Sequence, residues 1–208
     1  MSALGLALAS LFPLLNPFAA LPLFAQLTSG MERGTRNRTA RTAAIAVLVI
    51  LVVAVLGGRY LLEGLGVSLP ALQAAGGVVV GATALRMVTG ADTRVRDDDR
   101  PAAPPSTSTS VGVVPLAIPM IAGPGAISVS IALVGRFDDV LSTLWILLAA
   151  LIMSVIVWIV LRFGQPLLER LGTTGIGVLT RVFGLVILAI AVQLVAEGAT
   201  QLFPALKG

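Results

Sequence analysis

Long apolar stretches alternate with short polar stretches along the whole chain, and this pattern predicts a bundle of membrane-spanning helices. Six stretches are apolar and about 20 residues long or more, enough to cross about 30 Å of hydrocarbon at 1.5 Å per residue. They cover residues 3–27, 42–62, 69–90, 111–135, 141–161 and 178–203. The expected fold class is therefore an all-α membrane protein with six transmembrane helices.

The composition agrees with a membrane protein. Of the 208 residues, 57% are hydrophobic and only 12% are charged, which is about half the charge of a typical soluble domain. The chain has no cysteine and no histidine, so disulfides, thiolate chemistry, histidine proton relays and most zinc or haem sites are excluded. We expect no cofactor and no metal. The net charge of +4 does not indicate nucleic acid, because the arginines lie between the apolar stretches rather than in one patch.

The first apolar stretch is interrupted near its middle. It contains Pro13, Pro17 and Pro22, and Asn16 directly precedes the middle proline, which biases the backbone of Asn16 away from the helical region. No basic residue precedes Arg33, whereas a secretory signal peptide begins with a basic region. We therefore expect a retained helix that is broken at Asn16-Pro17.

The fourth apolar stretch is interrupted as well, at Gly123-Pro124-Gly125. Proline removes a backbone donor and clashes with the preceding turn. In lipid the freed backbone groups must find partners, so such breaks persist only where protein or a water-filled cavity surrounds them. Paired discontinuous helices are typical of transporters, whose substrate sites lie at the breaks. We expect the two breaks to face each other near the bilayer midplane.

A change of composition after the third apolar stretch divides the chain. Residues 91–110 contain Asp97, Asp98 and Asp99 and then a run rich in proline and serine. This run is typical of a disordered linker. A metal site at the three aspartates is disfavoured, because hard cations prefer a preformed cage of ligands. We therefore expect a three-helix half over residues 1–90, a cytoplasmic linker over 91–110, and a second three-helix half over 111–208.

The two halves register without a gap when the sequence is shifted by 107 residues. Asn16-Pro17 then lands on Gly123-Pro124, and Gly77 lands on Gly184. Identity between the halves is near chance, so the indication is the shared register of three helices and of the broken one. Three spans per half would give the halves opposite orientations, which predicts two inverted three-helix repeats with broken first and fourth helices. The alternative is six ordinary helices with proline kinks.

The distribution of positive charge predicts the orientation in the membrane. Eleven of the fourteen basic residues fall in or beside the polar stretches 28–41, 91–110 and 162–177, and three fall on the other side. The positive-inside rule places the eleven in the cytoplasm and both termini outside it.

Backbone groups at the two breaks suit a small zwitterion. The half-helix after Pro124 would offer free N–H groups and a positive dipole end to a carboxylate. Carbonyls freed by Pro17 and Pro124 could accept from an ammonium group, and Asn16 carries both a donor and an acceptor. Gly123 and Gly125 would leave room for a ligand the size of glycine or alanine.

Polar side chains near the breaks extend this candidate site. Ser128, one turn after the second break, could add a hydroxyl, and Gln73 on the third helix is a further candidate, with Ser130 and Gln193 behind it. Each has a structural alternative. Asn16 could cap the second half of the first helix, Ser128 could bond the carbonyl four residues earlier, and Gln73 could be interfacial. The glycines beside Gln73 are expected to be packing residues.

No charged side chain falls at the predicted centre of any span, which argues against a side-chain proton carrier. Coupling to a proton or to sodium through backbone carbonyls stays open. No span carries a carboxylate pair or a nucleophile with its base, so we do not expect an enzyme. A lipid-handling or structural membrane protein remains the alternative to a transporter.

Three segments resemble the MarC family of small bacterial inner-membrane proteins, which is also called the neutral amino-acid transporter family. They are residues 16–22 with Asn16-Pro17 and Leu21-Pro22, residues 69–77, and residues 115–127 with Gly123-Pro124-Gly125. The resemblance implies six helices in two groups of three, a place in the bacterial inner membrane, and movement of small neutral amino acids such as glycine or alanine. The chain departs from the family pattern mainly in its long linker. The glycine-rich third helix could pack within one subunit or between subunits of a homo-oligomer.

Overall fold

The computed structural model describes residues 2–90, 122–137 and 139–203, and every regular element among them is an α-helix. The helices are α1 (Ala3–Leu15), α2 (Pro17–Leu27), α3 (Arg33–Gly64), α4 (Leu69–Thr89), α7 (Pro124–Phe137), α8 (Val140–Phe163) and α9 (Gln165–Leu202). The all-helical class predicted from the sequence is confirmed for this part of the chain.

Four of the described helices are long and apolar enough to cross a membrane: α3, α4, α8 and the Gly177–Leu202 part of α9. The pair α1 and α2 would make a fifth span, bent by 40° at its break. Helix α7 is apolar but shorter, and residues 111–121 of the predicted fourth span lie outside the described residues. The count of six spans therefore stays a prediction.

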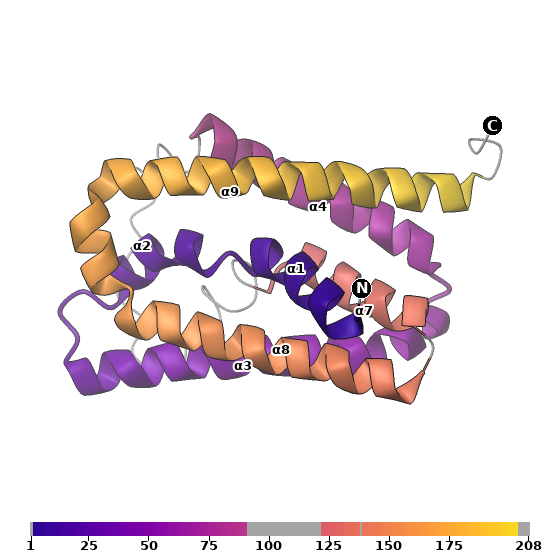
Figure 1. Cartoon of the computed structure of the whole chain (residues 1–208), viewed down its shortest axis with the longest axis horizontal. Coiled ribbons are helices and arrows are strands. Elements are labelled where there is room, and N and C mark those ends of the chain that lie inside the picture. The colour runs from indigo at the N-terminus through magenta and orange to yellow at the C-terminus, as the bar shows by residue number, and fades with distance from the viewer. Residues whose placement is uncertain (1, 91–121, 138, 204–208) are drawn as a thin grey trace.

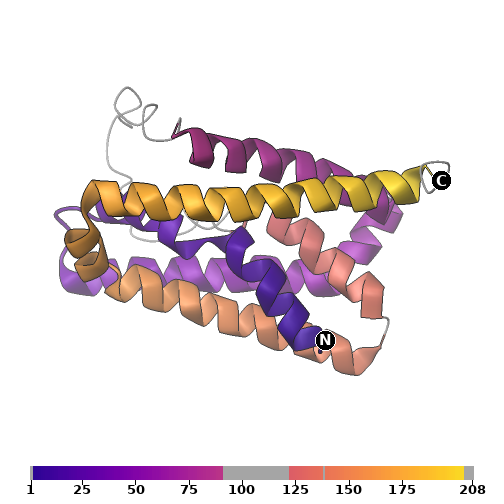
Figure 2. The same ribbon diagram turned by 45° about the horizontal axis from the view of Figure 1, so that its top comes forward.

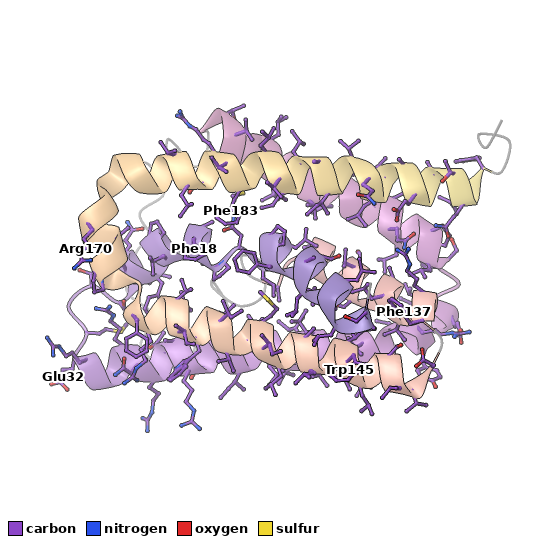
Figure 3. The ribbon with its side chains drawn as sticks, viewed as in Figure 1. Phe18, Glu32, Phe137, Trp145, Arg170 and Phe183 are labelled. Atoms are coloured by element: carbon purple, nitrogen blue, oxygen red, sulfur yellow. The ribbon has the colours of Figure 1, made fainter. Side chains whose placement is uncertain are left out.

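The helices form three layers (Figures 1 and 2). Helices α4 and α9 pack together on one side, α3 and α8 pack together on the other, and the broken helix α1–α2 lies between the two pairs with α7. Helices α3 and α8 run in opposite directions, because Glu32 before α3 and Trp145 early in α8 lie at opposite ends of the molecule (Figure 3). The largest group of buried apolar side chains joins α1, α2, α3, α7 and α8.

Local signals explain where two of the spans begin. The Ser68 hydroxyl accepts a hydrogen bond from the backbone N–H of Ala71 at 3.4 Å, and Gly90 ends α4 with a φ of 73°. Asp139 caps α8, because its Oδ2 accepts from the backbone N–H of Ser142 at 2.9 Å. Hydrogen bonds from the side chain and then the backbone N–H of Ser142 lower the pKa of the exposed Asp139 carboxyl below its ordinary value.

Two predicted polar loops are wrong in part. Helix α3 begins at Arg33, so most of residues 28–41 is helical, and α9 begins at Gln165, inside the predicted loop 162–177. Arginine is a good helix former, and Thr39 and Ala40 are fully buried, so packing supports the charged first turns of α3. In α9 the interruption is confined to Gly172, whose φ of 60° and ψ of −175° only glycine adopts without strain.

Helices α4 and α9 approach closely through small residues. A Cβ placed on Gly77 would lie 2.7 Å from Val195 Cγ2 and 2.8 Å from the carbonyl oxygen of Ala191. A Cβ on Gly184 would lie 3.1 Å from Val88 Cγ2. Small residues that let helix backbones approach are typical of membrane helix pairs. The expected packing role is therefore confirmed at Gly77.

Candidate functional site

The first break is built around Asn16. Its backbone is left-handed, with φ 32° and ψ 65°, and its N–H donates to the carbonyl of Phe12 at 3.2 Å. Its side-chain Oδ1 accepts from the N–H of Ala19 at 3.4 Å, so Asn16 does cap α2, as the structural alternative held. Asparagine tolerates this conformation better than most residues, and Pro17 at the first helical position has no N–H that needs a partner. Asn16 is buried at 6% exposure, and its Nδ2 has no hydrogen-bond partner among the described residues.

The second break lies at the start of α7. The carbonyl of Gly123 accepts from the N–H of Ala126 at 3.0 Å, and Pro124 is the first helical residue. Ser128 is 1% exposed, and its hydroxyl donates to the carbonyl of Pro124 at 2.8 Å. The hydroxyl also lies 3.4 Å from the carbonyl of Leu72 on α4. Ser128 therefore bonds its own helix, as the structural alternative held, and also links α7 to α4.

The two breaks lie next to each other. A Cβ on Gly125 would lie 3.5 Å from Leu14 Cδ2, which belongs to the last turn before the first break, and would overlap the side chain of Val80. The expectation that Gly125 leaves room for a ligand is therefore wrong in this conformation, because Val80 and Leu14 fill the space. Gly123 is half-buried and Pro124 is exposed.

Three phenylalanines cover the first break on the side of α9. The ring centroids of Phe12 and Phe18 are 6.5 Å apart, and Phe183 of α9 lies 6.0 Å from the first ring and 5.9 Å from the second. Figure 3 shows Phe18 and Phe183 beside each other between α2 and α9. We call these residues the aromatic cluster. The sequence analysis did not single them out, although Phe12 and Phe18 flank the break.

A pocket of about 580 Å³ opens between α1, α4, α7 and α9, a volume typical of small-molecule sites. We call it the polar pocket. Its polar lining residues are Ser10, Gln73, Arg136, Gln193, Glu197 and Gln201. Gln73 is 8% exposed, and its Oε1 has no hydrogen-bond partner among the described residues, so it is a buried residue of the pocket wall.

Glu197 is one of four polar residues of the pocket that sequence reasoning missed, with Ser10, Arg136 and Gln201. Its Oε1 accepts from Gln193 Nε2 at 2.9 Å, and Gln201 follows one turn later on the same wall. The signal was present in the sequence, because residues four apart on a helix share a face. Ser130, in contrast, donates to the carbonyl of Ala126 at 2.7 Å inside α7 and does not line this pocket.

The polar pocket lies close to the second break but not around the first. Its wall includes Gln73 and Val129. Gln73 follows Leu72 in the sequence and Val129 follows Ser128, and the Leu72 carbonyl and the Ser128 hydroxyl contact each other. Asn16 and Pro17 do not line it. Among the residues that the structure describes, no group of three acidic side chains is placed to hold a metal ion, and the predicted acidic tract 97–99 lies outside them.

This arrangement defines an α-helical integral membrane protein with a broken helix α1–α2 and a polar pocket near the start of α7. The chain belongs to the MarC family: the model of the MarC family integral membrane protein matches residues 1–203. The resemblance noted from the helix breaks is thus confirmed over nearly the whole chain.

Named relatives are membrane proteins of similar length. The UPF0056 membrane protein MJ1677 of Methanocaldococcus jannaschii is 34% identical over 194 residues, which is 93% of this chain and 94% of that protein. The UPF0056 membrane protein YhcE of Escherichia coli is 32% identical over 196 residues, 94% of this chain and 91% of that protein. The UPF0056 inner membrane protein MarC of Salmonella paratyphi A is 29% identical over 218 residues, 96% of this chain and 95% of that protein. No solved structure matches the chain.

Proposed function

We propose that this protein transports small neutral solutes, such as glycine or alanine, across the bacterial inner membrane by alternating access at its two broken helices. Both termini would lie outside the cytoplasm, and a proton or sodium ion would be the coupling ion if transport is coupled. The Salmonella relative is named an inner membrane protein, which supports the location.

The observation that carries this proposal is a pair of buried, unpartnered amide atoms. Asn16 Nδ2 is a free donor at the first break, and Gln73 Oε1 is a free acceptor in the wall of the polar pocket. Leaving a buried polar atom unpaired costs about 1–3 kcal/mol, so a ligand that pairs with it gains affinity. A zwitterionic amino acid offers a carboxylate to a donor such as Asn16 Nδ2 and an ammonium group to an acceptor such as Gln73 Oε1. Of the two amides only Gln73 lines the polar pocket in this conformation, so Asn16 would join the site only in another state of the cycle.

The helix boundaries support the inverted repeat, an architecture found in many transporters that work by alternating access. Helices α2 and α7 begin at Pro17 and Pro124, and α3 and α8 begin at Arg33 and Val140, so both pairs of starts differ by 107 residues. The equivalent helices α3 and α8 run antiparallel (Figure 3), as repeats of opposite orientation must.

A pair of contacts in the α4–α9 interface repeats with the same shift. Gly77 packs against Val195, and Gly184 packs against Val88. Adding 107 to Gly77 and Val88 gives Gly184 and Val195, so the two contacts exchange when the halves exchange. A two-fold axis in the membrane plane produces such an exchange.

The repeat also indicates where a second opening would form. The polar pocket is lined mostly by the second half, and Ile190 is one of its wall residues. The residue 107 positions before Ile190 is Thr83, in the part of α4 nearer Arg86. The equivalent wall of the first half would therefore lie at Thr83. The structure would then be open toward the outer face, with the aromatic cluster closing the path toward the cytoplasm.

The test is uptake and counterflow of labelled glycine, alanine and serine in proteoliposomes, with and without a proton or sodium gradient. Gln73→Met is the decisive variant, because methionine has a similar length and no unmet acceptor. We expect it to unfold at the same or a higher temperature and to lose at least about tenfold in transport, since one hydrogen bond to a charged group contributes about 1.5–3 kcal/mol.

Thr39→Val is the matched control. Thr39 is fully buried, and its hydroxyl already donates to the carbonyl of Thr35 at 3.1 Å, so its loss should leave transport unchanged. Unchanged transport in Gln73→Met would remove Gln73 from the site. No exchange of any of the three amino acids by folded wild-type protein, under either gradient, would refute amino-acid transport and favour the lipid-handling or structural alternative.

A further inference from the structure

A second groove runs between α3 and α8, on the side of the molecule away from the α4–α9 pair. It has a volume of about 490 Å³, and we call it the α3–α8 groove. Its lining residues are Asn37, Arg38, Arg41, Ala44, Ile45, Leu48, Leu151, Ser154, Val155, Trp158 and Arg162. None of them lines the polar pocket or belongs to either break, so this groove is separate from the proposed transport site.

The groove is amphipathic along its length. Arg38 and Arg41 near the start of α3 and Arg162 near the end of α8 gather at one end, because the two helices run antiparallel (Figure 3). No carboxylate lines the groove, and none of these three arginines has an ion-pair partner among the described residues. Guanidinium groups are suited to phosphate, which they bind through two parallel hydrogen bonds.

The other end of the groove is apolar and open toward lipid. Ile45, Leu151 and Val155 are 49%, 46% and 44% exposed, and they lie on helices long and apolar enough to cross the membrane. Trp158 stands between the two ends, with the guanidinium carbon of Arg162 5.4 Å from the centroid of its ring. A tryptophan beside an arginine is typical of the headgroup level of a bilayer.

A third buried, unpartnered polar atom lies in the wall of this groove. Ser154 is 5% exposed, and its hydroxyl has no hydrogen-bond partner among the described residues. In an apolar helix a serine usually bonds a carbonyl of its own preceding turn, as Ser128 and Ser130 do here. Ser154 lies four residues, about 6 Å along α8, from Trp158 and twice that from Arg162, which places it between the arginines and the apolar end.

We propose that the α3–α8 groove is a binding site for an anionic phospholipid of the leaflet at its arginine end. The phosphate lies among Arg38, Arg41 and Arg162, the Ser154 hydroxyl donates to an ester carbonyl one step deeper, and an acyl chain follows the apolar wall. The succession of positive charge, hydroxyl donor and apolar surface matches the succession of phosphate, ester and chain in a glycerophospholipid. The arginines thus hold the α3–α8 pair at a fixed depth in the bilayer.

Native mass spectrometry of the delipidated full-length protein in neutral detergent tests this site. The probes are phosphatidylglycerol, phosphatidylcholine with the same chains, and glycerol phosphate without chains. We expect the wild type to prefer phosphatidylglycerol. Arg41→Gln and Arg162→Gln should each weaken its binding by about fivefold, because a basic residue at a lipid surface contributes about a factor of five. They should weaken phosphatidylcholine less, because the choline cation offsets the charge of its phosphate.

Ser154→Ala should weaken both lipids by a similar factor of about five, since both carry the ester, and should keep the preference between them. Arg86→Gln is the matched control: it removes one positive charge from the last turn of α4, outside the groove, and should change neither lipid. Each variant must unfold at a temperature close to that of the wild type before its binding is compared.

Several results would overturn the proposal. One is equal binding of the two lipids by the wild type, and another is a loss in Arg86→Gln as large as that in Arg41→Gln. Binding of glycerol phosphate as strong as that of phosphatidylglycerol would show a phosphate site without a lipid. Because none of these measurements depends on transport, the lipid site and the proposed transport activity stand or fall separately.

Discussion

Replacing Gly77 by alanine gives the most direct test of the close approach between α4 and α9. The added Cβ would lie 2.7 Å from Val195 Cγ2, 2.8 Å from the carbonyl oxygen of Ala191 and 2.9 Å from the backbone nitrogen of Val195. Two of these atoms are backbone atoms of α9, so relief requires the helices to separate. Inserting a methyl group into a packed contact costs about 1–3 kcal/mol.

The intrinsic preference of helices for alanine opposes this cost by up to about 1 kcal/mol. The net expectation is a loss of about 1–2 kcal/mol at Gly77. Gly184→Ala should lose less, because the nearest atom there is Met87 Cβ at 2.9 Å and the backbone nitrogen of Val88 is 3.2 Å away. Gly81→Ala is the matched control on the same helix, since its Cβ would meet only Ala191 Cβ at an ordinary 3.5 Å.

Thermal unfolding of the three purified variants in one detergent measures this order. A change of 1 kcal/mol corresponds to about 2–4 °C for a chain of this size, so Gly77→Ala should unfold about 2–8 °C below the wild type. Gly184→Ala should lie between it and Gly81→Ala, which should equal or exceed the wild type. Equal stability of Gly77→Ala and Gly81→Ala would show that α4 and α9 are not tightly packed at Gly77. Wild-type stability of Gly184→Ala would show that the contact expected from the repeat is not tight.

Two further expectations concern the ends of the helices and the second opening. Hydrogen bonds from Ser142 lower the pKa of Asp139 below its ordinary 3.8. The ionised carboxylate therefore stabilises the fold above pH 3.8, and this stabilisation is lost as pH falls through the lowered pKa. Unfolding curves of Asp139→Ala and wild type should differ at neutral pH and converge below pH 3.8. Since the chain contains no cysteine, Ile190→Cys and Thr83→Cys can be labelled singly with a membrane-impermeant maleimide, and we expect the first to react from outside and the second from the cytoplasm. Labelling of both from one side would contradict the exchange of openings.

The positions of the helices could be predicted from hydrophobicity, and the ends could not. The predicted span 69–90 became α4 (Leu69–Thr89) and 141–161 became α8 (Val140–Phe163), because a capping residue and a change in polarity coincide there. Polarity changes near residues 42 and 178, yet α3 begins earlier, at Arg33, and α9 begins earlier, at Gln165. A helix extends beyond the apolar layer wherever its residues favour helix and its inner face finds contacts, and those contacts are not visible in the sequence.

The break at Asn16 was predictable because a proline and the residue before it restrict the backbone directly. The space around the second break was not. The absence of a side chain at Gly125 is equally consistent with an open site and with a close neighbour, and only the fold places Val80 there. The same ambiguity applied to Ser128, whose hydroxyl satisfies its own helix and also reaches the Leu72 carbonyl.

The polar pocket depended on the pairing of helices from different halves. Gln73 and Gln193 are both polar residues in predicted apolar spans. The sequence around each of them does not indicate that the two lie close together. Helix α4 packs against α9 in opposite direction, so Gln73 early in one and Glu197 late in the other come to the same level. The proposed inverted repeat would produce pairing of this kind, because it relates the third helix of each half.

Two consecutive glycines of α4 bear on the proposed transport cycle, because each contacts a different helix. Gly77 fixes α4 against α9, whereas its neighbour Gly76 lies directly against Ser128 of α7. Helix α4 therefore packs against α9 through Gly77 and contacts the first turns of α7 through Gly76. Any shift of the α4–α9 pair relative to the broken helices must change the Gly76–Ser128 contact, which lies beside the wall that carries Gln73. Residues that pack the helices and residues that line the polar pocket are thus adjacent on α4. In the proposed cycle a movement of the α4–α9 pair would therefore reach the pocket without a charged side chain at the centre of the membrane.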